Sequence, residues 1–486
     1  MKKTLLNSCM AIIAMSTFLT AKAEPFTVDG ITYNLLTDGS GVEVTEGEYS
    51  GEIVIPATVK YGNITYKVTA IGKRAFQNNE DVISVKLPNT ILEIGDYAFN
   101  ASDIQSIDLG QSVEIIEEGA FSVMRNLKTI SEIPASCVKM DGGIFTMNDA
   151  LTAINVSPDN KVYKSVDGVV YTKSGTRLVA YPTGKGNEYT IAEGTDTIGA
   201  NVFNTNQSLK RINFPSSLKV VDIAAFTYCT AMETNDLPEG LEKVYANAFS
   251  NCRKMASKVP STITFLGNMA FNNCYKITEA TINDRITNFG SQTFASANSM
   301  TKLTFMPNPV SITAIPDFAF QSCGSLSELI IPEGYTEIGS YAFSGSKNIK
   351  KIDLPSSMTS INTAAFNYVN PDTIIIRAAV PPTYLNQTYH LFGTDCFETV
   401  KVFVPEESIS AYEEAWIWKF FKNYLPISNL TSGIADTEFS AEVVAKTYYN
   451  IQGIEVPAPE SHDGKFYIIK TTYSDGSVKT AKTINR

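Results

Sequence analysis

The stretch Ile331–Phe366, IPEGYTEIGSYAFSGSKNIKKIDLPSSMTSINTAAF, contains one sequence unit almost twice. When the stretch is aligned with itself at an offset of 23 residues, Phe343 lies over Phe366 and Ile338 lies over Ile361. The unit reads Ile-Gly-x-x-Ala-Phe, followed by Leu or Ile six, nine and eleven residues after the Phe, and then by Pro. Because the rest of the chain is organised around this unit, it decides the fold.

The Phe of this unit recurs along most of the chain, usually after 22 or 23 residues, with one gap of 82 residues between Phe121 and Phe203. We call these residues the ladder Phe residues: Phe76, Phe99, Phe121, Phe203, Phe226, Phe249, Phe271, Phe294, Phe320, Phe343 and Phe366. A period in the low twenties is the signature of a solenoid, whose units must stack to bury their apolar faces. We therefore predict that the ladder rings contact one another from turn to turn.

The apolar residues after each ladder Phe end at a spacing of two, which is typical of a short strand. One such set is Leu326, Leu329 and Ile331, and Pro332 follows it where strand pairing should stop. Stacked units would form a parallel sheet with about 4.8 Å between turns. The predicted fold class is thus a repeat solenoid, mainly β with loops and short helical turns.

This unit resembles the repeat of the BspA-like bacterial leucine-rich repeat family. The resemblance rests on Ile338, Gly339, Ala342 and Phe343 with the apolar residues and Pro that follow, and it covers about residues 65–400. It implies a leucine-rich repeat fold in a bacterial surface or secreted protein.

The first residues have the pattern of a signal peptide. Lys2 and Lys3 precede an apolar run, and Ala21-Lys22-Ala23 is a small-x-small cleavage site, so we expect cleavage after Ala23 and export. Without residues 1–23 the formal charge changes from −11 to −14, because this segment carries three lysines and no acid. An acidic exported chain is a poor candidate for binding nucleic acid, and no later apolar run is long enough to span a membrane.

The chain divides into segments: a signal peptide (1–23), an N-terminal β cap (24–65), the solenoid (66–370) with a β-hairpin insertion at about 155–192, a C-terminal cap (371–430) with a helix over 406–423, and a small β domain (436–486). The insertion contains Val169–Tyr171 and Leu178–Tyr181, which we expect to form a protruding hairpin. The helix is expected because Ile409, Tyr412 and Trp416 lie at helical spacing.

The last segment contains alternating strand-like runs with a hairpin turn at Asp475-Gly476. Through the turn Tyr449–Gly453 and the strand Gly464–Ile468 it resembles, more weakly, the C-terminal sorting domains of Bacteroidetes secreted proteins. The alternative is a plain β appendage.

Four cysteines share one repeat position, three residues after a ladder Phe: Cys229, Cys252, Cys274 and Cys323. Other units place Asn or Ser there, so we expect a small, buried, weakly hydrogen-bonding slot. Neighbouring turns are close enough for a disulfide, whereas side chains that point inward in parallel would remain free thiols.

The sequence has few groups that could carry chemistry. The two histidines, His390 and His462, lie far apart and offer no zinc-ligand spacing. Cys396 follows His390 by six residues, either as a dyad or as a loop residue beside a packed thiol. We therefore expect a non-enzymatic protein without cofactor or metal.

The outward positions of the repeat strands form the candidate binding face: Lys86, Arg211, Asn213, Glu279, Lys302, Lys351 and Asp353. Any one of them can also be a merely solvated residue. Their mixed charge favours protein contacts over sugar stacking. We therefore expect an adhesin-like protein whose partners are extracellular or cell-surface proteins, and the family resemblance suggests host matrix.

The alternative is a surface glycan-binding protein. Trp416 and Trp418 would supply an aromatic platform for sugars, unless they only cover the last turn.

Overall fold

The computed structural model describes residues 24–37, 39, 41–233, 236–384, 391–393, 396–432, 443–449, 455–457, 466–473 and 478–484. The chain forms two compact units, one up to Leu425 and one from Pro426. The expected signal peptide with its cleavage site, His390, His462 and the Asp475-Gly476 turn lie outside the described residues.

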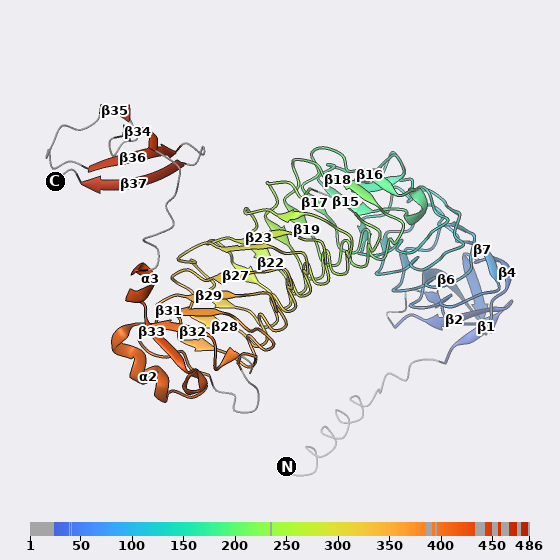
Figure 1. The fold of residues 1–486 in the computed structure, drawn as a ribbon. Coiled ribbons are helices and arrows are strands. Elements are labelled where there is room, and N and C mark those ends of the chain that lie inside the picture. The colour runs from blue at the N-terminus through green and yellow to red at the C-terminus, as the bar shows by residue number, and fades with distance from the viewer. Residues whose placement is uncertain are drawn as a thin grey trace, which may run out of the picture. The chain divides into compact units, whose positions relative to one another are not determined.

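The first unit is a stack of coils whose short strands pair in parallel from turn to turn (Figure 1). Its N-terminal part has one sheet that runs from the cap into the repeats: β1 (Phe26–Val28), β2 (Ile31–Leu35), β3 (Val42–Val44), β6 (Ile64–Ile71), β8 (Glu93–Ile94), β10 (Ile115–Ile116) and β12 (Lys139–Met140), with β5 (Thr58–Tyr61) paired to β6. A second sheet contains β4 (Gly51–Val54), β7 (Val82–Lys86), β9 (Ser106–Asp108) and β11 (Thr129–Ile130).

The C-terminal part repeats the arrangement. One set of sheets holds the strands that precede a ladder Phe: β17 (Thr197–Ile198), β19 (Val220–Val221), β20 (Lys243–Val244), β22 (Phe265–Leu266), β24 (Asn288–Phe289), β26 (Ala314–Ile315), β28 (Glu337–Ile338) and β30 (Ser360–Ile361). The other set holds β16 (Glu188–Thr190), β18 (Arg211–Asn213), β21 (Lys258–Val259), β23 (Glu279–Ile282), β25 (Lys302–Phe305), β27 (Glu328–Ile330), β29 (Lys351–Leu354), β31 (Thr373–Ile376), β32 (Lys401–Val404) and β33 (Asn423–Pro426).

The ladder rings stack face to face along the interior. Successive centroids are 4.8 to 5.5 Å apart and the ring planes differ by 4° to 14°. Phe145 and Phe392 extend the two runs, although neither follows the Ile-Gly-x-x-Ala sequence. Tyr181 lies 4.7 Å from Phe203 at the start of the second run.

Each ladder Phe sits at a corner built by two left-handed residues. The residues two before and two after the Phe have positive φ in every turn, for example Ala224 (53°) and Tyr228 (60°) around Phe226. With this backbone, the N–H groups of Ala224, Phe226 and Tyr228 all point toward the next turn. They donate to main-chain carbonyls there at 2.9, 2.7 and 2.9 Å, respectively. The corner is therefore a further main-chain ladder beside the two strand rows.

The insertion does not protrude, contrary to the sequence-based expectation. β13 (Tyr163–Val166), β14 (Val169–Thr172) and β15 (Arg177–Ala180) pair antiparallel, and β15 continues in parallel into the following sheet. On β14, Val170 packs in the N-terminal apolar core, whereas Val169 and Tyr171 pack in the C-terminal one. The hairpin is thus the joint between two cores, and three consecutive apolar residues are needed because both faces are buried.

The C-terminal cap contains the expected helix, but the expected bounds of 406–423 are wrong. A 3-10 turn at Glu406–Ser408 leads into α2 (Ile409–Glu414), and the helix ends at Ala415, whose backbone is extended. Ile417 then adopts φ of 68° before a second 3-10 turn at Trp418–Phe420. The reversal happens because burial of Trp418 against the last turn outweighs continuation of a short helix.

The second unit contains α3 (Ser428–Ser432) and an antiparallel sheet in the order β35 (Glu455–Val456), β34 (Val443–Tyr449), β36 (Phe466–Tyr473) and β37 (Val478–Ile484). Most of the turn and part of the strand that suggested a sorting domain lie outside the described residues. That resemblance stays a prediction.

Candidate binding surfaces

The predicted face is spread over several strands rather than gathered in one cluster. The side chains of Lys86, Arg211, Asn213, Lys302 and Lys351 are exposed. Glu279, which is half-buried, and Lys302 occupy facing positions on neighbouring strands. The other residues lie in three further sheets: Lys86 on β7, Arg211 and Asn213 on β18, and Lys351 and Asp353 on β29.

Asp353 does not belong to this face, because it is only 9% exposed. The Arg377 guanidinium donates two hydrogen bonds to the Asp353 carboxylate, from Nε to Oδ1 at 3.0 Å and from Nη2 to Oδ2 at 2.8 Å. The same contact raises the pKa of Arg377, so its positive charge persists at all ordinary pH values. The carboxylate of Asp353 is therefore occupied by its ion pair with Arg377, so Asp353 is not a binding residue of the predicted face.

Most of the other charges on the face are neutralised by neighbours one turn away. Glu279 Oε1 lies 3.1 Å from Lys258 Nζ, and Arg211 Nη1 lies 3.5 Å from Glu188 Oε1. The Nζ atom of Lys86 lies 3.9 Å from Asp108 Oδ2. These exposed pairs are worth little individually, but they lower the net potential of the surface.

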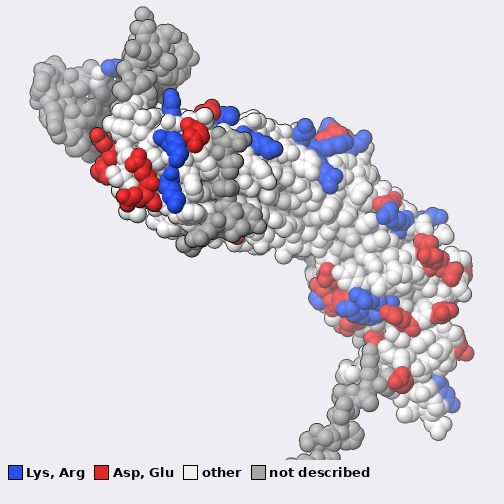
Figure 2. Space-filling model, turned by 60° about the horizontal axis from the view of Figure 1, so that its bottom comes forward, with Lys and Arg blue, Asp and Glu red and all other residues white. Residues whose placement is uncertain are grey.

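Lys302 and Lys351 are the exceptions, since neither forms an ion pair in the part of the chain that the structure describes. Asn213 donates from Nδ2 to Thr190 Oγ1 at 2.8 Å. On the face in Figure 2, lysines and arginines lie among acidic residues, with wide uncharged areas between them. The two lysines are thus the free cations of the predicted face.

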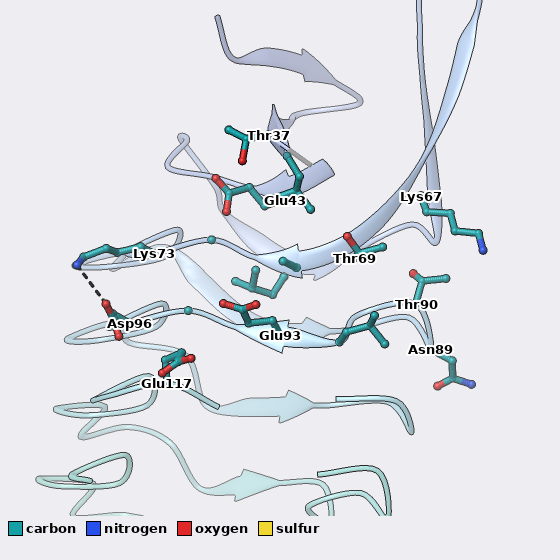
Figure 3. Close-up of a pocket in the computed structure, with 16 residues that line it drawn as sticks. Thr37, Glu43, Lys67, Thr69, Lys73, Asn89, Thr90, Glu93, Asp96 and Glu117 are labelled. Carbon is teal, nitrogen blue, oxygen red and sulfur yellow. Dashed lines mark hydrogen bonds and ion pairs between the residues drawn. The ribbon is translucent and has the colours of Figure 1, made fainter. Parts of the chain in front are cut away.

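An acidic hollow, which the sequence analysis missed, lies where the cap meets the first repeats (Figure 3). Its volume is about 970 Å³. Glu43 and Glu93 lie on either side of Ala70, and the backbone at Gly72 and Gly95 packs so closely on the preceding strand or turn that a Cβ there would come within 3 Å of it. Its acids come from the cap (Glu43) and from the first repeats (Glu93, Asp96 and Glu117), so no single stretch of the sequence signals the hollow.

The charges around this hollow are partly paired. Lys73 Nζ lies 3.1 Å from Asp96 Oδ2, and Lys139 Nζ lies 2.9 Å from Glu117 Oε2. A hydrogen bond with Asp141 raises the pKa of Glu117, so the two carboxyl groups compete for one lysine. The hollow keeps an acidic character that suits a cationic contact.

The two tryptophans have different surroundings. Trp418 is fully buried, and its Nε1 donates to the Pro382 carbonyl at 2.9 Å while its ring packs against Phe392. Trp416 is 41% exposed, and Lys419 Nζ lies 4.8 Å above its ring. Trp418 therefore covers the end of the ladder, and only Trp416 can meet a ligand.

The repeated cysteine slot contains free thiols. The six cysteines among the described residues are buried and form no disulfide. Cys229 Sγ donates to the carbonyl of Phe203 in the preceding turn at 3.0 Å, and Ser346 makes the same contact with Phe320. Burial raises the pKa of Cys323 to about 12, which keeps this thiol protonated and unreactive at neutral pH.

Other chemistry finds no support in the described parts of the chain. They contain no group of three His, Cys, Asp or Glu side chains placed to hold a metal ion. No helix there has the length and apolar character to cross a membrane. Cys396 donates from Sγ to the Gly393 carbonyl at 3.1 Å, while its suggested partner His390 lies outside the described residues.

The repeat is matched by a known sequence family. Residues 57–166, 196–313, 257–373 and 313–398 match the BspA type leucine rich repeat region, which is described as having six copies. The chain belongs to the BspA-type leucine-rich repeat family. The ladder corner and its two strand rows are thus this chain's version of the BspA-type repeat.

Solved structures of leucine-rich repeat proteins are similar to this BspA-type protein. A leucine-rich repeat protein from Bacteroides ovatus is 22% identical with a TM-score of 0.50, over 82% of this chain and 99% of that one. A leucine-rich repeat protein from Eubacterium ventriosum is 23% identical with a TM-score of 0.49, over 65% and 93%. A leucine rich cell surface protein from Faecalibacterium prausnitzii is 23% identical with a TM-score of 0.43, over 76% and 97%. No curated protein matches the chain.

Proposed function

We propose that this protein is an exported, non-enzymatic binding protein that presents its solenoid surface to proteins outside the cell, in the manner of an adhesin. The observation that carries the proposal is the extended outward row of strand positions, with exposed, unpaired cations at Lys302 and Lys351. Solenoids bind through such extended surfaces, and mixed polar groups suit protein partners. The signal-peptide pattern of residues 1–23 supports export.

The test measures binding of residues 24–486 to immobilised extracellular matrix proteins at low and high salt. The variant Lys302→Glu/Lys351→Glu reverses the two free cations, and we expect it to weaken binding about tenfold. The matched control Lys254→Glu/Lys347→Glu makes the same change in charge at exposed lysines in turns, and it should bind like the wild type. Equal binding by both double variants, or no saturable binding by the wild type, would reject the outward face as the binding site.

A second candidate function is glycan binding at the C-terminal cap. It is favoured by Trp416, whose ring is partly exposed beside the buried aromatic cluster. On a glycan array, Trp416→Ala should then abolish binding, while Tyr368→Ala, which removes an aromatic side chain that is 63% exposed, should not. Retention of all glycan signals by Trp416→Ala would eliminate this candidate.

A further inference from the structure

The N-terminal cap covers the first strand row of the solenoid and leaves the second one open. β1, β2 and β3 continue the first sheet beyond the repeats. The second sheet ends at β4, and no further strand joins it among the described residues. An uncovered sheet edge presents unpaired N–H and C=O groups, and these can pair with another strand.

The unpaired groups belong to Glu52 and Val54. Gly51 and Ile55 donate their N–H groups inward, to the carbonyls of Asp81 and of the last residue of β7, at 2.9 and 3.0 Å. Successive residues of a strand direct their main-chain groups to opposite edges. The main-chain groups of Glu52 and Val54 therefore point away from β7.

This edge is accessible. Val54 is 66% exposed, and a Cβ built on Gly51 would meet no atom within 4 Å. The neighbouring edge at β1 is different, because the ring of Tyr61 stacks on Phe26 with the centroids 4.0 Å apart. The cap protects one edge with an aromatic contact and leaves β4 uncovered.

A hollow of about 300 Å³, lined by apolar and polar residues, adjoins the open strand. Val54, Val28, Ile31, Pro56 and Val59 form its apolar part, and Asp29 and Lys60 line it as well. A strand added beside β4 would place alternate side chains on this side of the sheet, where one of them can enter the hollow. The hollow thus offers a place for a single apolar side chain of a partner.

The acidic charge of the cap favours some partner strands over others. Residues 24–65 carry seven acidic residues and one lysine, which is a net charge of −6. Glu52 lies on the open strand itself, and Glu48 is exposed just before it. An approaching segment rich in lysine or arginine would be attracted, whereas an acidic one would be repelled.

We propose that β4 receives an extended, basic segment of a partner protein as an added strand, which pairs with Glu52 and Val54 and places an apolar side chain in the hollow beside Val54. This is recognition by strand addition, in which the main chain supplies affinity and alternate side chains supply selectivity. Lys86 of the predicted face lies opposite Val54 on β7, but Lys302 and Lys351, on which the proposed function rests, lie on β25 and β29 in other sheets. Either site can therefore fail without affecting the other.

The probe is a short fluorescent peptide in which lysine and valine alternate, titrated against residues 24–486. One matched peptide carries N-methylated amides and cannot pair as a strand, and another has glutamate in place of lysine. Val54→Pro removes the outward N–H of the open edge, and Val54→Thr keeps it with a side chain of similar shape. Thermal unfolding of both variants shows whether the fold is retained.

We expect the lysine peptide to bind the wild type and Val54→Thr equally, and to bind Val54→Pro about tenfold more weakly, as loss of a main-chain hydrogen bond implies. The N-methylated and glutamate peptides should bind at least as weakly as that. If the N-methylated and parent peptides bind equally, main-chain pairing contributes nothing to the affinity and the proposal is overturned. Absence of binding by the parent peptide would overturn it as well. If Val54→Pro unfolds, the N-methylated peptide alone decides the question.

Discussion

Individual residues in this repeat adopt backbone conformations that most side chains disfavour. The corner requires left-handed residues on both sides of every ladder Phe, but the chain fills these positions with Asn, Gly, Ser, Ala, Tyr and even Val. A β-branched residue is the least suited to positive φ. Main-chain hydrogen bonds to the next turn hold these residues there, as when Val123 N–H donates to the Thr146 carbonyl at 2.7 Å, and the strain is distributed along the solenoid.

Val123 and Thr205 are the β-branched residues at these positions, and Val123 has φ of 63° with a half-buried side chain. We expect Val123→Asn to raise the free energy of unfolding by about 1 kcal/mol, because Asn tolerates the left-handed region. Urea denaturation would measure the change. The reverse exchange at an equivalent position, Ser296→Val, should destabilise by a similar amount. If Val123→Asn destabilises the protein, side-chain packing rather than backbone strain dominates at this position.

The buried thiols make stability depend on pH. Burial raises the pKa of Cys137 and Cys323 to about 12, above the usual value of about 8.5 for an unfolded thiol. The unfolded chain therefore loses these protons first, so the stability contributed by the neutral thiols is complete below about pH 8 and declines as the pH rises toward 12.

Alkylation tests the same residues. Iodoacetamide at pH 8 should leave the native protein unmodified, whereas unfolding of residues 24–486 should expose six reactive thiols. Fewer than six after unfolding without a reductant would show that disulfides form between turns. The melting temperature at several pH values should fall in the alkaline range, and a constant value there would contradict the titration argument.

Among the elements, the C-terminal cap shows how a local periodicity can mislead. The spacing of Ile409, Tyr412 and Trp416 suggested one long helix, but the left-handed Ile417 reverses the chain and allows Trp418 to be buried. The cap is organised by what fits over the last ladder ring, because covering an exposed ring stack removes more apolar surface than a further helical turn would.

This assignment predicts unequal effects of two tryptophan substitutions. Trp418→Ala should lower the free energy of unfolding by about 3–5 kcal/mol, since it opens a cavity and leaves the Pro382 carbonyl without its donor. Trp416→Ala should change it by less than about 0.5 kcal/mol. Chemical denaturation compares them under identical conditions. A larger loss for Trp416→Ala would mean that the exposed ring, not the buried one, secures the cap.

At the scale of the first unit, the apolar interior consists of two clusters that meet at the inserted hairpin. Phe99 lies in the N-terminal cluster and Phe249 in the C-terminal one. Stacked repeats depend mainly on nearest neighbours, so a change of packing at one joint can divide the stack into separate cooperative units. The insertion is therefore the place where cooperativity should weaken.

We expect calorimetry to resolve two unfolding transitions within the solenoid. Phe99→Ala should lower the temperature of one transition and Phe249→Ala that of the other, each by removing a ring worth about 3–5 kcal/mol. The two substitutions serve as controls for each other because both sit at equivalent ladder positions. If instead a single unfolding transition appears, and both variants lower its temperature equally, the hairpin joins the two apolar clusters into one cooperative unit.

The sequence by itself determined the repeat, its register and the stacking of the ladder Phe residues. A unit of 22 or 23 residues cannot bury its own apolar face, so its period alone requires a stack. The alternation after each Phe then predicts which strand positions point inward. It also shows the acidic charge of the cap, although it cannot show where that charge gathers.

Only the tertiary structure decided the exceptions to the period. Asp353 is buried because Arg377, one turn later, folds back over it, and Ile417 reverses because Trp418 finds a place against Phe392. The open edge of β4 likewise depends on which row the cap strands join. These outcomes rest on contacts between residues far apart in the chain, whereas a repeat pattern reports only the environment that successive units share.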